Sequence, residues 1–337
     1  MSRAQGWTLT FVMALGASGA ALGHEAADPR NCRGIEPNGP ELNGTAMSRV
    51  PAVGCPPIGG IQLRVVELAQ GVKLKSGQEL RDVRVLEGAL KSGTLSPRDF
   101  IGAQLSGVSE TGPLVSLKID DIAVAAKAPG AAQVAGGDLL LYKLSYQWRD
   151  AADRSSWAPL CKDGGLAVAL PGQWDLTVGT GGGGKRSSVP VEVTFACQGS
   201  AIAKCVTQMG YRPWAAGPGG VSLDALHQSC VRAVRADYCG TGQSNTMPGE
   251  QVNFYDSAGL LKDGAEWPLE AQWTPDGARC VQSTRIAKLP KDLRTKRGET
   301  GVRDWVSRTC PKQLHACAAG QAGTVVITEV NGATPAK

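Results

Sequence analysis

Alternation of apolar and polar residues is the strongest pattern in the first two thirds of the chain. It is clearest over 140–148 and recurs over 115–119 and 191–197, and each run predicts a strand with one buried face. The apolar face of the first run consists of Leu140, Tyr142, Leu144, Tyr146 and Trp148. Turns rich in Gly and Pro separate such runs, so we expect a β-sandwich or a barrel-like fold over residues 61–197.

Two shorter runs, 166–170 and 174–178, flank Pro171 and Gly172 and predict a β-hairpin. The stretch 123–137 is rich in Ala and Gly and poor in polar residues, and it predicts a long loop. Short strands joined by turns and loops are typical of an all-β part.

Helical spacing replaces alternation after these strands. Ser222 is a suitable N-cap for a helix that we expect to continue to Asp237. The apolar stripe of this helix consists of Leu223, Leu226, Cys230, Val231 and Val234. His227, Arg232 and Arg235 should lie away from that stripe or on its border.

Short strands after the helix complete a mainly β chain with an α+β second part. They are expected around 252–255, 269–273 and 279–285, and a weaker one over 325–330. The resulting organisation is a signal peptide over 1–23, an irregular segment containing Cys32 and Cys55 over 24–60, a β-rich domain over 61–197, a small disulfide-stapled α+β domain over 198–320 and a fraying tail over 321–337.

The N-terminus has the pattern of a secretory signal peptide. Arg3 precedes an apolar, small-residue run over 7–22, and cleavage is expected near Gly23. The run is too short and too rich in Gly and Ala to span a membrane, which takes roughly 20 strongly apolar residues. The first cysteine, Cys32, is not placed for lipid attachment, so we expect a secreted or periplasmic protein.

Ten cysteines in an exported chain predict disulfides, because an even number of thiols in an oxidising compartment tends to pair. They are Cys32, Cys55, Cys161, Cys197, Cys205, Cys230, Cys239, Cys280, Cys310 and Cys317. A helix continuing to Asp237 would hold the Cα atoms of Cys230 and Cys239 roughly 12–13 Å apart, beyond the roughly 7 Å reach of a disulfide. We therefore predict the pairs Cys32–Cys55, Cys161–Cys197, Cys205–Cys230, Cys239–Cys280 and Cys310–Cys317.

The net charge of +5 over 337 residues is mild. A basic run over 288–297 is interrupted by Asp292 and contains no aromatic residue, which is typical of a solvated loop. Proteins that bind nucleic acids concentrate positive charge on one face, so no nucleic-acid partner is expected.

The glycine-rich run from Gly179 to Gly184, followed by Lys185, matches the spacing of a phosphate-binding loop. Arg186 stands where such a loop needs Ser or Thr, and a predicted strand follows in place of a helix. The run therefore predicts a flexible turn and no cofactor.

Metal binding and catalysis are both weakly supported. The residues with metal-ligand chemistry are His227, Cys230, Cys239, His315 and Cys317, but the chain contains no C-x-x-C and export favours disulfides. His227 and Asp237 could serve a nucleophile, yet no free thiol is expected and the mature chain has no G-x-S-x-G elbow. Carboxylates available for sugar hydrolysis are Asp237, Asp256, Asp263, Glu266 and Glu270, and nothing singles out two of them.

We therefore assign no catalytic, cofactor-binding or metal-binding residue. Four tryptophans gather in the second part of the chain, where exposed rings would stack on sugars and buried rings would fill a core that is poor in Phe. They are Trp214, Trp267, Trp273 and Trp305. Because Trp is largely buried on average, the core is favoured.

The run Arg235-Ala-Asp-Tyr-Cys239-Gly240 resembles the ADYC domain, a bacterial family named for its tetrapeptide. Similar pieces are Phe195-Ala-Cys197, Ala203-Lys-Cys205-Val206, Gly210-Tyr-Arg-Pro-Trp214 and Leu226-His-Gln-Ser-Cys230-Val-Arg232. The resemblance covers about residues 157–285 and extends more weakly back to about residue 90. It implies an exported or surface-attached bacterial protein and no particular activity. Many members resemble lipoproteins, whereas this chain lacks a lipidation cysteine.

Export, paired cysteines and the lack of a catalytic motif together predict a non-catalytic structural or ligand-binding protein of the bacterial envelope or extracellular space. The alternative is a hydrolase that acts on cell-envelope or extracellular polysaccharide or peptide. For either function, an envelope glycan or protein is the partner class to test.

Overall fold

The computed structural model describes residues 41–47, 61–110, 112, 114–125, 137–149, 155–246, 250–262, 267–285, 306, 310, 313–318, 323, 326–331 and 334–335. The predicted signal peptide, Cys32 and Cys55 lie outside the described residues, and so does most of the predicted loop over 123–137. Strands dominate, as the sequence pattern predicts.

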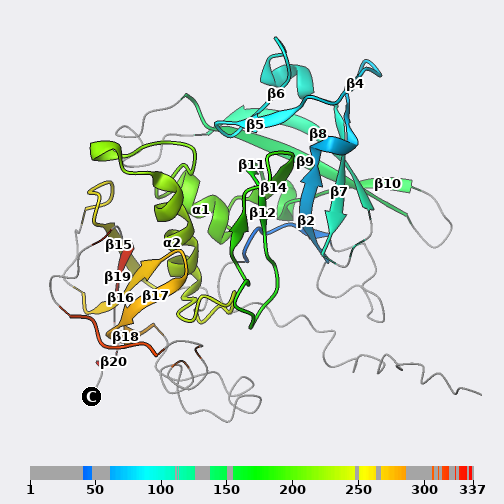
Figure 1. Cartoon of the computed structure of the whole chain (residues 1–337). Coiled ribbons are helices and arrows are strands. Elements are labelled where there is room, and N and C mark those ends of the chain that lie inside the picture. The colour runs from blue at the N-terminus through cyan, green and yellow to red at the C-terminus, as the bar shows by residue number, and fades with distance from the viewer. Residues whose placement is uncertain are drawn as a thin grey trace, which may run out of the picture.

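Six antiparallel strands form a closed barrel, seen in the upper part of Figure 1. In order around the barrel they are β2 (Ile61–Glu67), β14 (Glu192–Cys197), β11 (Ala167–Pro171), β9 (Leu140–Arg149), β8 (Leu114–Val124) and β7 (Gln104–Ser109). Pairing of β2 with β7 closes the ring, so a barrel is the observed form of the predicted β-rich fold.

Short strands extend or flank the barrel. Those that join its sheet are β1 (Ala46–Met47), β3 (Val72–Lys73), β4 (Glu79–Leu80) and β10 (Ser155–Pro159). Two separate pairs are formed by β5 (Arg84–Leu86) with β6 (Ala89–Lys91), and by β12 (Gln173–Trp174) with β13 (Arg186–Ser187).

The predicted alternation is clear in β9, whereas β11 is buried on both faces. Tyr142 and Leu144 of β9 belong to the core inside the barrel. In β11, Ala169 belongs to that inner core, while Val168 and Leu170 belong to a second core shared with the helices. Strand β11 is thus buried on both faces, and packing is continuous across the domain boundary expected near residue 197.

The hairpin predicted around Pro171 and Gly172 does not form. Strand β11 pairs with β14 and β9, and only the first residue of the predicted 174–178 strand, Trp174, is in a strand. The chain turns instead, because the Asp175 carboxylate accepts hydrogen bonds from the backbone and hydroxyl of Thr177. Strand β8 continues to Val124, into the first residues of the predicted loop.

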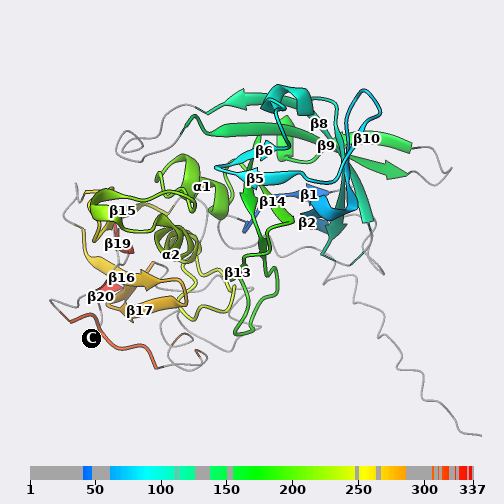
Figure 2. The same ribbon diagram turned by 45° about the horizontal axis from the view of Figure 1, so that its top comes forward.

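Two helices lie between the barrel and the C-terminal sheet, as the views in Figures 1 and 2 agree. Helix α1 (Ala201–Thr207) contacts β14 and α2 (Leu223–Arg235), and α2 contacts the sheet. The Ser222 hydroxyl accepts a hydrogen bond from the Asp224 backbone, which confirms the predicted N-cap. Helix α2 ends at Arg235, two residues earlier than predicted.

The three α2 side chains expected at the border of the apolar stripe or away from it are buried as well. His227 and Arg232 are each 1% exposed and Arg235 is 7% exposed. Because α2 packs against α1 on one side and a sheet on another, almost its whole circumference is covered. Neither α-helix of the described residues has the length and apolar character needed to cross a membrane.

The C-terminal sheet confirms the strands predicted after the helix. Its order is β15 (Val252–Asp256), β19 (Val326–Val330), β16 (Leu269–Thr274) and β17 (Gly277–Val281). A separate short pair is β18 (Ser283–Thr284) with β20 (Thr334–Pro335). Strand β19 lies between β15 and β16, so the weak strand expected near the C-terminus is an inner strand of this sheet.

Four disulfides lie within the described residues, and they confirm two of the predicted pairs. The confirmed pairs are Cys161–Cys197 and Cys205–Cys230. Cys230 and Cys239 do not pair with each other, as predicted.

Two predicted pairs, Cys239–Cys280 and Cys310–Cys317, are wrong. The observed bridges are Cys239–Cys310 and Cys280–Cys317. The His315 carbonyl accepts a hydrogen bond from the Val281 backbone, so this late segment follows the end of β17 and reaches Cys280. Proximity in sequence favoured the local pair Cys310–Cys317. In the structure Cys310 is linked to Cys239, after helix α2, and Cys317 is linked to Cys280 of strand β17.

Digestion of the native protein without reductant should release linked peptides containing Cys239–Cys310 and Cys280–Cys317. Mass spectrometry before and after reduction identifies both pairs. Peptides linking Cys239 to Cys280 would contradict this arrangement of the C-terminal segment.

Candidate functional site

The tetrapeptide from Ala236 to Cys239 forms the exit of helix α2. Ala236 has a φ of 49°, in the left-handed region that only a minority of non-glycine residues adopt. This conformation reverses the chain, and the Asp237 backbone donates a hydrogen bond to the Arg232 carbonyl. The turn therefore directs Asp237 and Tyr238 into the interior.

Asp237 is almost fully buried and is held from three sides. Its carboxylate forms an ion pair with Arg232 and accepts hydrogen bonds of 3.0 Å and 2.8 Å from the backbones of Thr241 and Gly242. Arg232 also donates to the Pro275 carbonyl. Removing one partner of a buried ion pair typically costs about 3–5 kcal/mol, so this arrangement serves to hold the fold together.

Tyr238 joins the helix exit to the C-terminal sheet. Its hydroxyl donates to the Glu270 carboxylate at 2.7 Å and accepts from the Arg285 backbone, and its ring stacks on Trp273 with centroids 5.2 Å apart. Burial, followed by the Glu270 charge, raises the pKa of Tyr238 well above its usual value. The phenol therefore stays protonated and donates to Glu270.

Glu270 and Arg285 form a buried ion pair beside the C-terminal end of helix α2. The guanidinium donates to both carboxylate oxygens, at 3.1 Å and 2.8 Å, and to the carbonyls of Ala233 and Val234 in the last turn of α2. The Ala233 carbonyl also accepts from the Ala236 backbone, and Arg285 adds donors to these last carbonyls where water is excluded.

The glycine-rich run from Gly179 to Gly184 packs against helix α2 and the turn that follows it. Arg232 donates to the Gly183 carbonyl at 2.6 Å, Gln228 donates to the Gly184 carbonyl at 2.8 Å, and the Gly179 backbone donates to the Thr241 carbonyl at 2.8 Å. A side chain at Gly183 would overlap neighbouring backbone. Gly183 therefore allows the backbone segments to pack closely. Glycine at this position of the run has a packing role, which is an alternative to phosphate binding.

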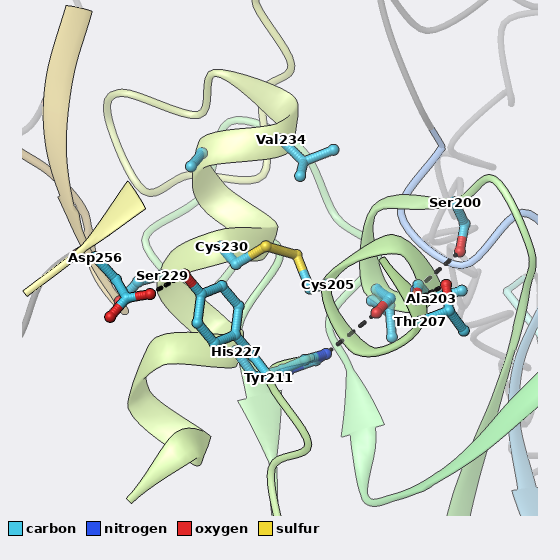
Figure 3. The surroundings of a disulfide bond; sticks show 12 residues. Ser200, Ala203, Cys205, Thr207, Tyr211, His227, Ser229, Cys230, Val234 and Asp256 are labelled. Atoms are coloured by element: carbon cyan, nitrogen blue, oxygen red, sulfur yellow. Dashed lines mark hydrogen bonds between the residues drawn. A yellow bond between two sulfur atoms is a disulfide. The ribbon is translucent and has the colours of Figure 1, made fainter. Parts of the chain in front are cut away.

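His227 lies inside the protein beside the disulfide Cys205–Cys230 (Figure 3). Its Nε2 lies 3.2 Å from the Ile202 carbonyl, which assigns the proton to that nitrogen, and its ring meets Trp174 edge to face. Burial lowers the pKa of His227 to about 3, with smaller contributions from that hydrogen bond, which raises it, and from Arg186, which lowers it. Since Arg232 binds Asp237, the proposed histidine–aspartate pairing is not formed.

The other carboxylates named from sequence also have structural partners where the structure describes them. Asp256 accepts the Tyr211 hydroxyl at 2.9 Å, visible in Figure 3, and the backbones of Ala258 and Leu261. Asp263 and Glu266 lie outside the described residues. No group of three His, Cys, Asp or Glu side chains within the described part could hold a metal ion.

The tryptophans divide between core and partial exposure. Trp273 is fully buried and its indole donates to the Thr328 hydroxyl, whereas Trp214 and Trp267 are half-buried. Trp305 lies outside the described residues. The core role expected for tryptophan is therefore confirmed at Trp273.

An open hollow of about 560 Å³ lies at one end of the barrel, beside the disulfide Cys161–Cys197. This volume is in the range of small-molecule sites. Its apolar lining comes from Tyr146, Ala158, Pro159 and Cys161, and its polar lining from Glu41, Lys162, Asp163, Gln198 and Ser200. The disulfide joins the segment after β10 to the end of β14 and so fixes two walls of the hollow.

Glu41 is a charged residue of this hollow whose pKa is shifted by its surroundings. Burial raises the pKa of its carboxyl, and the charges of Arg235 and Lys162 oppose part of that effect. Asp163, which lines the same hollow, has a φ of 55°, a left-handed conformation that is strained for a non-glycine residue. Sequence patterns did not point to Glu41, because it lies in a segment without periodicity and only the folded chain brings it to the barrel.

The protein is β-rich and disulfide-bonded: a closed barrel is joined through two helices to a small sheet, and the described part contains four disulfides. The tetrapeptide from Ala236 to Cys239 is buried at the end of helix α2. A model of the ADYC domain family matches residues 97–287, more than half of the chain. The chain belongs to the ADYC domain family. Searches of curated proteins and of solved structures returned no significant match.

Gly183→Ala should destabilise the protein, because the added Cβ would lie 2.3 Å from the Thr241 carbonyl oxygen and 2.5 Å from that of Thr177. The expected loss is about 1–3 kcal/mol, measured by urea denaturation. Gly181→Ala is the matched control, since its Cβ would meet nothing within 4 Å. Equal stability of the two variants would contradict the packing role of the run.

His227 should make stability fall as the pH decreases from about 6.5 towards 3. Its pKa is about 3 when folded and 6.5 when free, so in this window the unfolded chain binds a proton that the folded chain refuses. The stability contribution is complete above pH 6.5 and falls by up to about 1.4 kcal/mol per pH unit below it. Denaturation of wild type and His227→Gln over this range isolates the effect, and parallel curves would contradict it.

Proposed function

We propose that this ADYC protein is an exported, non-catalytic ligand-binding protein of the bacterial envelope or extracellular space. The ligand would bind in the hollow at the end of the barrel. Support for export comes from the N-terminal sequence pattern and from the described disulfides, which persist in oxidising compartments.

One observation carries the non-catalytic assignment. The chemically reactive side chains named from sequence and described by the structure are engaged in structural contacts: His227 is buried, Asp237 is paired with Arg232, and the described cysteines are in disulfides. The barrel-end hollow, in contrast, is lined by both polar and apolar residues. This combination favours binding of a molecule with both characters.

A hydrolase acting on polysaccharide or peptide is the second candidate, because Glu41 and Asp163 line the same hollow. A carboxyl whose pKa is raised by burial is suited to donate a proton, as a general acid must. Glu41 would then be the acid and Asp163 the second carboxylate of a pair.

Sedimentation with insoluble peptidoglycan, with cellulose as a comparison, separates the two candidates. For a binding protein we expect the full chain in the peptidoglycan pellet, no soluble fragments, and less pelleted protein for Lys162→Ala and Glu41→Gln. Arg84→Ala, at an exposed position of β5, is the control for a changed surface charge. Release of fragments that stops in Glu41→Gln would establish the hydrolase, and absence from both pellets would contradict envelope-glycan binding.

A further inference from the structure

Strand β10 (Ser155–Pro159) has one open edge within the described sheet. Along one edge β9 pairs with β8, and along its other edge it pairs with β10 and then with β11. Strand β10 pairs with no other strand of the described residues, and it lies on the side of the barrel away from helix α2 (Figures 1 and 2). Its outer edge therefore presents backbone groups to which a further strand can bond.

Strand β14 covers the same side of the sheet beside β11 but ends before it reaches β10. Its last residue, Cys197, pairs with Ala167, the first residue of β11. The chain then turns at Gly199, which has a φ of 92°, and enters helix α1. The disulfide Cys161–Cys197 ties this point to the segment after β10, so β14 does not extend along β10.

The barrel-end hollow lies between β10 and the end of β14. Ala158 and Pro159 of β10 line one side of it, and residues 198–200, which follow β14, line another. Tyr146 of β9, directly opposite Ala158 in the ladder, also belongs to the lining. A strand added to the edge of β10 would thus run along the hollow.

The hydrogen-bond pattern of the ladder shows which backbone groups of β10 point outward. The Leu160 backbone donates to the Leu144 carbonyl of β9 at 2.8 Å. Bonded and non-bonded pairs alternate along an antiparallel ladder, so Ala158 bonds to β9 while the N–H and C=O of Trp157 point away from it. The Pro159 carbonyl points outward as well, and proline has no N–H to offer.

We propose that the ligand of the barrel-end hollow is an extended peptide that adds as a strand to the open edge of β10. This inference rests on the proposed function and names its class of ligand. The peptide backbone pairs with Trp157 and Pro159, in the way that β14 pairs with β11. Residues opposite each other in a ladder share a face, so the peptide side chain opposite Ala158 faces the hollow. Tyr146 and Ala158 make that part of the lining apolar, which favours an apolar side chain.

The edge itself disfavours a second copy of this chain as the added strand. Short edge strands and proline are the means by which natural sheets limit pairing with other edges, and β10 has five residues and ends in Pro159. A peptide needs only the donor and acceptors that remain, at Trp157 and Pro159.

An NMR titration of the folded full chain with synthetic peptides tests the pairing. The probes are capped seven-residue peptides that alternate Thr with Val, Leu or Phe and carry Lys at both ends. We expect at least one of them to shift the amide signals of Trp157 and Gln198 to saturation. The apolar residue opposite Ala158 points its own N–H away from β10, and the neighbouring Thr residues bond to β10. Methylation of two Thr backbone nitrogens should therefore weaken binding about tenfold or more, whereas methylation of two apolar residues is the matched control and should not.

A pair of protein variants removes the same donor from the other side. Trp157→Pro lacks the outward N–H but keeps the bonds between β10 and β9, a position where sheets tolerate proline. Trp157→Ala lacks the same indole and keeps the N–H, so the difference between the two variants reports the donor alone. Trp157→Pro should bind the peptide about tenfold more weakly than Trp157→Ala.

Several results would overturn the proposal. They are saturation by none of the peptides, equal affinity of the two methylated forms, equal affinity of the two Trp157 variants, and a concentration-dependent shift of Trp157 without peptide, which would indicate a second copy. A peptidoglycan disaccharide is titrated alongside. If it shifts Tyr146 and Gln198 while no peptide does, the peptide inference fails and a binding function of the hollow stands. If neither probe shifts them, both proposals fail.

Discussion

The C-terminal end of helix α2 is buried in protein, and its polar groups must be satisfied there without bulk water. A helix leaves its last carbonyls without internal partners, and their burial unpaired would cost free energy comparable to lost hydrogen bonds. Arg285 supplies donors to Ala233 and Val234, while the Arg235 carbonyl accepts from Asn245 and Ser244. The segments that follow the helix are held against its end because they provide these partners.

The same requirement explains the family tetrapeptide. Each of its residues meets a different need of the helix exit: a left-handed turn, a buried counterion for Arg232, a hydroxyl between Glu270 and the Arg285 backbone, and a disulfide to Cys310. These contacts build the framework, and the lining of the barrel-end hollow contains no residue of the tetrapeptide. Family membership therefore describes how the chain folds.

Local periodicity predicted the elements that depend on it. Strands β9 and β14 and helix α2 with its Ser222 cap follow from the sequence because alternation and helical spacing are local signals. Separation along the chain does not select disulfide partners, since the confirmed pair Cys161–Cys197 and the missed pair Cys280–Cys317 are 36 and 37 residues apart. The closure of β2 on β7 and the bridges to Cys310 and Cys317 pair segments far apart, which spacing does not encode. Burial of Arg232 was also missed, since charged residues are normally exposed and its partners become neighbours only after folding.

The central place of β19 in the C-terminal sheet sets an order for maturation. In the sheet, β15 and β16 do not pair with each other, and each pairs with β19 (Val326–Val330). The sheet therefore cannot form until β19, near the C-terminus, has been synthesised. Cys239 and Cys280 likewise wait for thiols at positions 310 and 317. During synthesis from the N-terminus the barrel can close first, whereas the C-terminal sheet and its two disulfides can be completed only when almost the entire chain is available.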